Sequence, residues 1–322
     1  MSEATVLERV EVAAGVLGPL AARGVPLGPM TTYRVGGAAA LWVKPRSVDE
    51  LHLIAEACRL GRLPVLVVGR GSNLLVADDG FAGVAMSLGE LSASIEITGS
   101  QVRAGGAVAL PMLARRTVAS SLTGFEWAVG VPGSVGGGVR MNAGGHGSDM
   151  AANLVEIDMF DLMRGEATVL PGSALGLRFR GSDLGDHQVV LDATLTLEPG
   201  DRSRSERELD EIVRWRREHQ PGGQNAGSVF VNPVPGEVTA GALIDRIGFR
   251  GHRLGTAHVS DKHANFIQAD EGGSAADVRA LIELVRERVA VETGHRMRSE
   301  VKLVGFEDPR EHPEHPDAGV RW

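Results

Sequence analysis

The hydrophobic and polar positions of the first quarter of the chain predict a strand, a helix and a second strand. Residues 39–43 predict a strand, and residues 47–50 have the spacing of a helix capping box. Apolar residues then recur at helical spacing as far as Cys58, and Gly61 ends the predicted helix. The apolar run 64–68 predicts a strand buried on both faces. Together these elements predict a β-α-β unit that leads into a glycine-rich loop.

The rest of the chain predicts further helices and strands. We expect helices over residues 108–119, 204–217, 240–247 and 274–294, and strands within 84–104 and 154–198 and at 301–304. Residues 1–30 carry only a weak pattern, and no element is predicted there. The polar, charged helix at 204–217 is interpreted as a domain boundary.

Composition adds one unusual feature to this pattern. Hydrophobic residues at 43% and charged residues at 23% are typical of a globular protein. Glycine, however, accounts for 43 of 322 residues, roughly twice its usual share of about 7%. The glycines fall in separate clusters rather than in repeats, which favours loops whose backbone closely approaches a ligand.

Charge and cysteine usage exclude several classes of function. The net charge is −8, and the chain has no basic run of the kind that binds nucleic acid. Cys58 is the single cysteine, so no internal disulfide is expected, and no metal-ligand spacing surrounds it. We find neither a signal-peptide pattern nor an apolar run long enough to cross a membrane. The sequence predicts a cytoplasmic protein without membrane insertion and without a metal site, and it gives no indication of oligomeric state.

The first glycine cluster, residues 69–73, directly follows the predicted buried strand. Successive backbone N–H groups in such a loop can form an anion-binding concavity, which glycine leaves open to a phosphate. The cluster lacks the third glycine of the Rossmann fingerprint, and no Gly-Lys-Ser/Thr follows as in a P-loop. The residues alone do not decide between a plain turn and a phosphate-binding loop.

The second glycine cluster covers residues 130–138 and is followed by a third group at 142–145. So many glycines would cost a purely structural loop a good deal of folding entropy. Separate loops of this type indicate an extended diphosphate ligand that is held at more than one point. An elaborate structural loop is the alternative.

Eight motifs give the chain a resemblance to a known family. From about Pro29 to Gly305 the sequence resembles the UDP-N-acetylenolpyruvoylglucosamine reductase (MurB) family, with the motifs in the family's order. Three local departures are Arg70 in place of a glycine, Phe179 in place of a tyrosine and Val231 in place of a lysine. The motifs lie at residues 31–37, 68–75, 130–137, 179–182, 225–233, 240–245, 259–266 and 300–305.

The resemblance implies an α+β fold with two functional parts. The first is an FAD-binding domain of the vanillyl-alcohol-oxidase (PCMH) type in two α/β subdomains, and the second is a smaller C-terminal α+β substrate-binding domain. We expect residues 1–200 to form the FAD-binding region, with the subdomain boundary near 105, and residues 201–305 to form the substrate-binding domain. Residues 306–322 are expected to be a loose tail.

The resemblance also implies an activity in peptidoglycan precursor synthesis. The reaction is the NADPH-dependent, FAD-mediated reduction of UDP-N-acetylglucosamine enolpyruvate to UDP-N-acetylmuramate. The implied cofactor is non-covalently bound FAD, with NADPH as co-substrate and a UDP-sugar as the small-molecule partner. A flavin oxidase of the same fold and a non-catalytic nucleotide-sugar sensor are the competing interpretations.

Three residues match the family's catalytic positions: Arg180, Ser228 and Glu300. Hydride addition beside a carboxylate concentrates negative charge, and the planar guanidinium of Arg180 suits that group. Ser228 is the implied proton donor, since the carbanion-like species is basic enough to take a proton from a hydroxyl within reach. Glu300 either hydrogen-bonds the substrate carboxylate as an acid or orients Arg180.

We expect substrate contacts from Asn232, Lys262 and His263, which lie in the motifs; a structural hydrogen-bonding role is the alternative for His263. His219, near the end of the charged helix and just before Pro221, is expected to replace part of the positive charge that Val231 removes. No clamping tyrosine is expected over the UDP group, because Tyr33 is the chain's one tyrosine and belongs to a flavin motif. The candidate FAD-binding residues are Arg34, Gly69, Arg70, Gly71, Ser72, Asn73, Leu74, Gly130, Pro132, Gly133, Ser134, Gly136, Gly137, Asn142 and Gly144.

Overall fold

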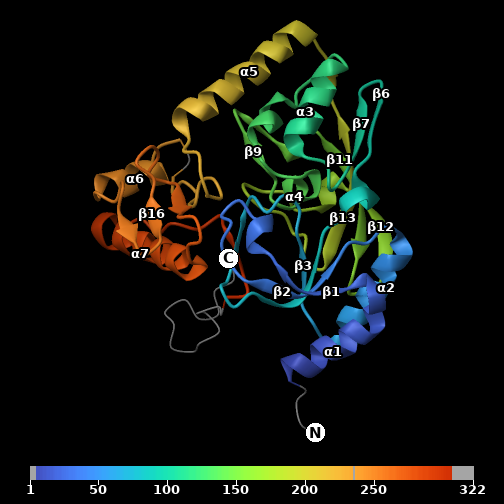
Figure 1. Cartoon of the computed structure of the whole chain (residues 1–322). Coiled ribbons are helices and arrows are strands. Elements are labelled where there is room, and N and C mark those ends of the chain that lie inside the picture. Colours follow the sequence, from blue (N-terminus) through green and yellow to red (C-terminus); the bar gives the residue numbers. More distant parts are fainter. Residues whose placement is uncertain (1–4, 235, 307–322) are drawn as a thin grey trace.

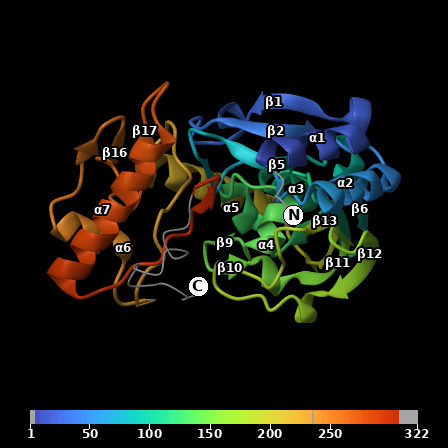
Figure 2. The ribbon, with the colours of Figure 1, turned by 90° about the horizontal axis from the view of Figure 1, so that it is seen from below.

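The computed structural model describes residues 5–234 and 236–306. Two subdomains pack against each other, and a C-terminal domain lies beside them (Figures 1 and 2). The tail that we expected to be loose lies outside the described residues from position 307 onward. Within the described part of the chain, no helix is long and apolar enough to span a bilayer.

The first subdomain is a four-stranded sheet covered by two helices. β2, β5 and β3 run parallel, and β1 joins the edge in the antiparallel direction. The two helices pack against each other and share a buried core with the sheet. Along the sheet the strands are β1 (Ala22–Pro26), β2 (Ala38–Val43), β5 (Phe81–Met86) and β3 (Val65–Val67), and the helices are α1 (Val6–Leu17) and α2 (Val48–Gly61).

The sequence pattern predicts no element over residues 1–30, but the structure has the helix α1 there. α1 begins at a capping box between Thr5 and Glu8 and buries Val10, Ala13 and Leu17. Its exposed face also carries apolar side chains, including Leu7 at 70% exposure. Apolar residues on both faces obscure the helical period that a sequence pattern relies on.

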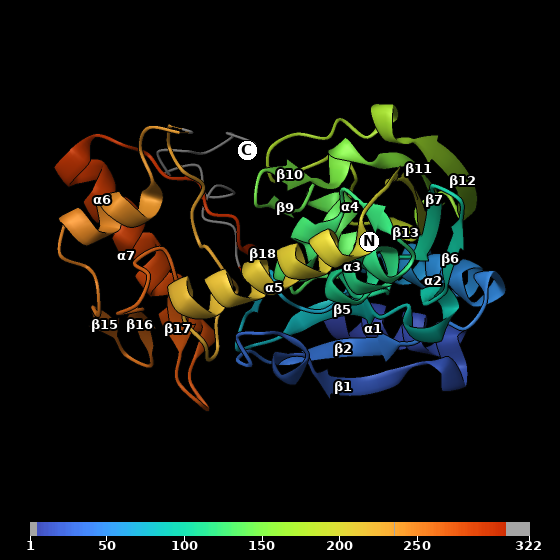
Figure 3. The ribbon, with the colours of Figure 1, turned by 90° about the horizontal axis from the view of Figure 1, so that it is seen from above.

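The second subdomain is a five-stranded antiparallel sheet with helices on one side. Figure 3 shows α5 lying along this subdomain and reaching toward the C-terminal domain. The strands, in sheet order, are β12 (Glu166–Pro171), β11 (Leu154–Asp161), β13 (Gln188–Thr196), β7 (Gln101–Gly105) and β6 (Ile95–Thr98), and the helices are α3 (Leu110–Ala119), α4 (Val135–Arg140) and α5 (Arg202–His219). Short two-stranded pairings join β14 (Glu198–Pro199) to β8 (Leu122–Thr123) and β10 (Ser148–Asp149) to β9 (Gly144–Gly145).

The C-terminal domain combines a three-stranded sheet with two helices. Val278, Leu281 and Val285 lie on the buried face of α7, at the spacing that the sequence predicts. The strands are β15 (Arg253–Leu254), β16 (Ala257–Val259) and β17 (Ile267–Ala269), and the helices are α6 (Ala240–Arg246) and α7 (Ala275–Thr293). The helices expected at 47–61, 108–119, 204–217, 240–247 and 274–294 are confirmed to within two residues at each end.

The expected domain boundary at residue 200 stays a prediction. Several contacts join the residues on its two sides. Leu209 and Ile212 of α5 belong to the core of the second subdomain. After the C-terminal domain, the chain returns as β18 (Lys302–Val304), which pairs in parallel with β4 (Leu74–Val76). The Asp78 carboxylate accepts hydrogen bonds from Ser274 and from the first backbone N–H groups of α7. The C-terminal domain is therefore attached to the rest of the molecule at both of its ends.

Candidate active site

A cavity of about 940 Å³ lies where the three parts of the molecule meet. The loop at 69–74 comes from the first subdomain and the loop at 130–138 from the second. The segments 225–230 and 300–302 add the walls on the C-terminal side. Among residues 5–234 and 236–306 no cluster of His, Cys, Asp or Glu could hold a metal ion.

The two glycine-rich loops approach each other closely at one end of the cavity. A Cβ atom on Gly69 would collide with Oγ of Ser134, and one on Gly71, which has φ 61°, would collide with the Met30 carbonyl. The Ser134 hydroxyl accepts from the Gly137 N–H at 3.4 Å, which starts α4 within the second loop. Glycine is needed at both positions because the space that a Cβ would take is already filled.

Buried polar atoms in this end of the wall fit a flavin nucleotide. Oγ1 of Thr32 and Nε1 of Trp127 are buried without a hydrogen-bond partner among the described residues, and both residues line the cavity. Unpaired buried polar groups are costly, so a ligand that pairs with them gains affinity. Together with the glycine-rich loops that line this end of the cavity, they suit a large cofactor with phosphate and ring polar atoms.

Most of the predicted cofactor residues line this cavity. The exceptions are Arg34, whose N–H donates to Thr31 at 3.1 Å, and Asn142. The buried Asn142 side chain instead holds the Ala151 N–H and the Arg178 carbonyl, which fixes the loops behind the wall. The residues that line the cavity are Gly69, Arg70, Gly71, Ser72, Asn73, Leu74, Gly130, Pro132, Gly133, Ser134, Gly136, Gly137 and Gly144.

Arg180 projects from the tip of a tight turn. Arg178 and Gly181 exchange backbone hydrogen bonds of 2.9 and 3.1 Å, which leaves Phe179 and Arg180 at the tip with φ 55° at Arg180. The guanidinium donates from Nε to Oε2 of Glu300 at 3.1 Å and from NH2 to the Gly144 carbonyl at 2.9 Å. The structure thus brings together two predicted residues that are 120 positions apart.

Glu300 is held firmly and largely hidden from solvent. Its N–H donates to the Val229 carbonyl at 2.7 Å, and its own carbonyl accepts from the Asn73 side chain at 2.8 Å. Burial raises the pKa of the Glu300 carboxyl, although the charges of Arg180 and Arg298 oppose that shift. A carboxyl group in this setting takes up a proton more readily than an exposed glutamate does.

Ser228 lies in the same cavity wall, half-buried. It follows Gly227, which has φ 79° and donates its N–H to Oδ1 of Asn225 at 3.0 Å. The next residue, Val229, is the backbone partner of Glu300. The same short backbone contact therefore fixes both Ser228 and Glu300 relative to Arg180.

The structure places only one of the four predicted substrate residues in the wall. Asn232 lines the cavity, and its Oδ1 accepts from the Ala240 N–H at 3.0 Å. His219 is exposed and stacks on Trp215, with 4.7 Å between ring centroids. Lys262 donates to the Arg217 carbonyl at 2.6 Å, and His263 accepts from the Asn265 N–H at 3.2 Å. His219, Lys262 and His263 are not among the lining residues.

The cavity wall also contains charged residues that the sequence analysis missed. Arg216 is half-buried in the wall, and within the described chain its guanidinium forms no ion pair. Burial lowers its pKa. Arg140, Asp186 and Lys302 line the wall as well, and ion pairs connect them. Arg216 stands in a strongly charged helix, a pattern that is typical of a solvated surface and gives no local signal of a site.

Comparison with known proteins agrees with this geometry. Residues 39–170 match the model of an FAD binding domain, and residues 219–304 match the model of the UDP-N-acetylenolpyruvoylglucosamine reductase C-terminal domain. The UDP-N-acetylenolpyruvoylglucosamine reductase of Heliobacterium modesticaldum is 41% identical over 282 residues, covering 87% of this chain and 89% of that protein. The reductase of the same name from Methylorubrum extorquens is 37% identical and covers 95% of this chain and 99% of that protein.

A solved structure supports the same relationship. The crystal structure of UDP-N-acetylenolpyruvylglucosamine reductase (MurB) from Thermus caldophilus has a TM-score of 0.75 and 32% identity, covering 88% of this chain and 98% of that one. The expected α+β fold, with an FAD-binding domain and an added C-terminal domain, is confirmed. On these grounds the chain belongs to the UDP-N-acetylenolpyruvoylglucosamine reductase family.

Proposed function

We propose that this chain reduces UDP-N-acetylglucosamine enolpyruvate to UDP-N-acetylmuramate, with FAD as cofactor and NADPH as electron donor. The observation that carries the proposal is the meeting of Arg180, Ser228 and Glu300 in one cavity wall next to two glycine-rich loops. Family membership supports the same reaction. A cytoplasmic location belongs to the proposal, because NADPH as donor and a free Cys58 suit a reducing compartment.

Arg180 binds and polarises the substrate carboxylate. FAD, once reduced by NADPH, would supply the hydride for the terminal carbon of the enolpyruvyl double bond. Negative charge then develops toward the carboxylate, and the fixed guanidinium of Arg180 stabilises it. The contacts of Arg180 with Glu300 and the Gly144 carbonyl hold the guanidinium in position before substrate arrives.

Ser228 delivers the proton to the carbon next to the carboxylate. Ser228 lines the cavity, and its hydroxyl forms no hydrogen bond with the described residues, which leaves it available to the substrate. Glu300 supports this step by holding Arg180, whose Nε donates to its Oε2 at 3.1 Å, and burial raises the pKa of the Glu300 carboxyl above that of an exposed glutamate. These roles of Arg180, Ser228 and Glu300 are our assignment.

Arg216 is the best-placed cation for the diphosphate of the substrate. It lines the cavity without a carboxylate partner in the described chain, whereas the exposed ring of His219 stacks on Trp215. A half-buried guanidinium without a counter-charge favours binding of an anion, and phosphate suits its planar fork. Arg216 therefore takes the role that the sequence analysis assigned to His219.

The proposed reductase activity can be tested by following its two half-reactions one after the other. The purified holoprotein is mixed with NADPH without oxygen until the flavin absorbance is bleached, and the enolpyruvyl UDP-sugar is then added. We expect rapid return of the flavin absorbance with stoichiometric lactyl product. An oxidase would regain its absorbance only on adding oxygen, and a sensor would bind the sugar without reoxidation; either result would overturn the proposal. Acid precipitation should release the yellow colour into the supernatant, because the flavin is bound non-covalently.

A further inference from the structure

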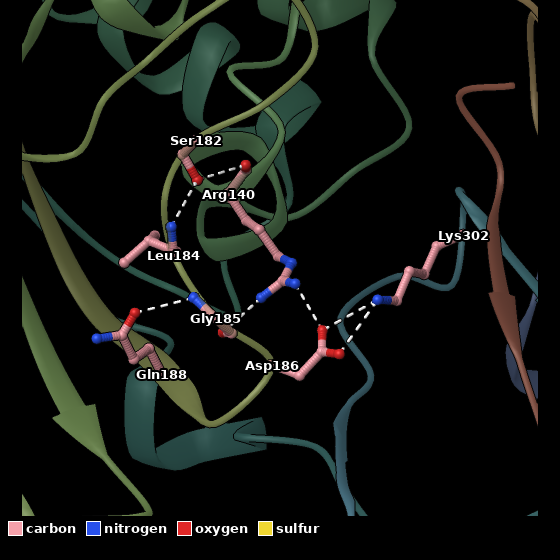
Figure 4. Close-up of polar contacts among 7 residues, drawn as sticks. All are labelled: Arg140, Ser182, Leu184, Gly185, Asp186, Gln188 and Lys302. Carbon is pink, nitrogen blue, oxygen red and sulfur yellow. Dashed lines mark hydrogen bonds and ion pairs between the residues drawn. The ribbon is translucent and has the colours of Figure 1, made fainter. Parts of the chain in front are cut away.

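A chain of ion pairs centres on Asp186, in the segment that follows the Arg180 turn (Figure 4). Arg140, at the end of α4, donates to the Gly185 carbonyl at 2.6 Å and to Oδ1 of Asp186 at 2.5 Å. On the other side of the same carboxylate, Nζ of Lys302 lies 3.2 Å from Oδ1 and 3.1 Å from Oδ2. Asp186 thus bridges two cations that belong to different parts of the fold.

This bridge runs beside the contact between the two catalytic side chains. Arg180 and Asp186 lie on one segment, and Glu300 and Lys302 lie two residues apart on the other. In the Arg180–Glu300 pair the cation belongs to the turn, whereas in the Asp186–Lys302 pair the cation belongs to β18. The two segments are therefore joined twice, by ion pairs of opposite polarity, and a shift along either one would separate both pairs.

The other hydrogen bonds of this segment run to the second subdomain, where the Arg178 carbonyl accepts from Asn142 and Arg180 donates to the Gly144 carbonyl. Ser182 donates its hydroxyl to the Arg140 carbonyl at 2.7 Å, and the Gly185 N–H donates to Gln188 at 2.9 Å (Figure 4). Neither of these contacts reaches β18. The bridge through Asp186 is thus the link between this end of the turn and the strand that follows Glu300.

We propose that Asp186 is a positioning residue, which bridges Arg140 and Lys302 and so keeps Arg180 and Glu300 in register for the reaction. This inference rests on the proposed function. The side chains of Asp186 and Lys302 are 58% and 44% exposed. Ion pairs with that exposure contribute little to stability. The effect of the bridge is therefore expected in the reaction geometry rather than in the melting temperature.

The primary test is Asp186→Asn in the holoenzyme, with the two half-reactions followed separately. We expect flavin reduction by NADPH to stay within about twofold of wild type. Reoxidation by the enolpyruvyl sugar should slow about tenfold, since small misplacements of catalytic groups cost up to about a hundredfold. Asp183→Asn is the matched control, because Asp183 lies on the same segment but pairs with Arg178 at the exposed surface. That variant should behave as wild type.

The pH dependence of reoxidation separates positioning from a simple change of charge. Arg180 from the turn and Arg298 from its own segment are the charged groups that act on Glu300. Loss of the negative charge of Asp186 alone would lower the pKa of Glu300. Loss of register would raise that pKa, because the carboxyl would stay buried and lose its contact with Arg180. We expect the limb of the pH profile assigned to Glu300 to move to higher pH in Asp186→Asn.

Variants at Lys302 test the bridge from its other end. Lys302→Gln should reproduce the slow reoxidation, the double variant should be no slower than either single one, and Lys302→Arg should restore most of the rate. Equal slowing of both half-reactions, an equal effect of Asp183→Asn, or a pH limb that moves downward would overturn the proposal. If wild type itself fails to react with the enolpyruvyl sugar, the proposed function fails. A wild-type rate in Asp186→Asn refutes only the positioning role.

Discussion

The two ends of the cavity are built in different ways. At the cofactor end, the wall is formed by two loops, 69–74 and 130–137, each of which is one continuous stretch of sequence. At the reaction end, the side chains of Arg180, Ser228 and Glu300 come from segments far apart in the sequence. The first kind of site is specified locally by glycine, and the second exists only after the C-terminal domain has docked.

One residue links the two ends. Asn73 belongs to the first glycine-rich loop, and its side chain donates to the Glu300 carbonyl at 2.8 Å. Its own carbonyl accepts from the Lys302 N–H at 2.9 Å. The asparagine therefore connects the loop that we assign to cofactor binding with the backbone of Glu300. Substitutions at the two ends should nevertheless have different effects, because we propose that one end binds the cofactor and the other carries the reaction.

The largest effect is expected at Ser228. Ser228→Ala should leave flavin reduction by NADPH nearly unchanged and slow reoxidation by the enolpyruvyl sugar by about 10²–10⁴-fold, as for a lost general acid. Ser228→Cys should recover part of the rate, because a thiol is a stronger acid in a similar position. Stopped-flow absorbance of each half-reaction measures this. Equal slowing of both halves would assign Ser228 to the cofactor end.

At the cofactor end, Gly69→Ala should weaken FAD binding about tenfold, since overpacking of this kind costs roughly 1–3 kcal/mol. The added Cβ would displace the Ser134 hydroxyl. Titration of apoprotein with FAD, followed by flavin fluorescence, gives the Kd. The matched control is Gly222→Ala, where no atom lies within 4 Å of the added Cβ.

A second variant sharpens this result. Ser134→Ala combined with Gly69→Ala removes the hydroxyl against which the new Cβ collides. We expect only partial recovery of FAD affinity, because the cofactor itself needs the space beside Gly69. Full recovery would show that glycine at this position serves loop packing alone.

The next prediction concerns Arg216, which lines the cavity beside Gly130 and which we propose binds the substrate diphosphate. Arg216→Gln should raise the KM for the enolpyruvyl sugar about tenfold or more and change kcat little, as expected for a lost charged hydrogen bond of about 1.5–3 kcal/mol. Arg217→Gln is the neighbouring control, since its side chain is exposed. An altered KM in His219→Ala, with Arg216→Gln unchanged, would reverse our assignment.

The smallest effect is a trend of stability with pH. Because the folded-state pKa of Glu300 is raised, its contribution to stability is present below the pKa of the unfolded chain and is lost as pH rises through the folded-state pKa. Glu300→Gln lacks this dependence. The melting temperature of the variant minus that of wild type should therefore increase between about pH 4 and pH 8, as differential scanning calorimetry of the holoprotein would show. A flat difference would mean that the carboxyl has its ordinary pKa.

The same contrast explains what could be predicted from the sequence. Helices and glycine-rich loops depend on neighbouring residues, so α2, α7 and the loop at 69–74 could be placed from pattern alone. The catalytic candidates came only through resemblance, because no local pattern shows that Arg180 will meet Glu300. The register between β4 and β18, which allows that meeting, is likewise a long-range property.

Charged residues were the hardest to interpret. Arg216 and Asp186 look like ordinary surface residues in the sequence, and Lys302 is given no role within the last motif, yet all three line the cavity. The opposite case is seen at His219 and Lys262, which stay predictions as substrate contacts: neither lines the cavity, the His219 ring is hydrogen-bonded to the Trp215 carbonyl within α5, and Lys262 donates to the Arg217 carbonyl of α5. Burial and partners decide the role of a charge, and both depend on tertiary packing.

The pairing of β18 with β4 has a consequence for engineering the protein. The polypeptide leaves the flavin-binding body through α5 and comes back to it as the strand Lys302–Val304, so the intervening lobe is topologically an insert. Cutting the gene after α5 would leave β4 without its neighbour and would expose its edge. A minimal flavoprotein is better made by internal excision, with a short linker joining His219 to the segment that begins at Glu300. Transplanting the lobe from a relative likewise requires two junctions, one on each side of the insert.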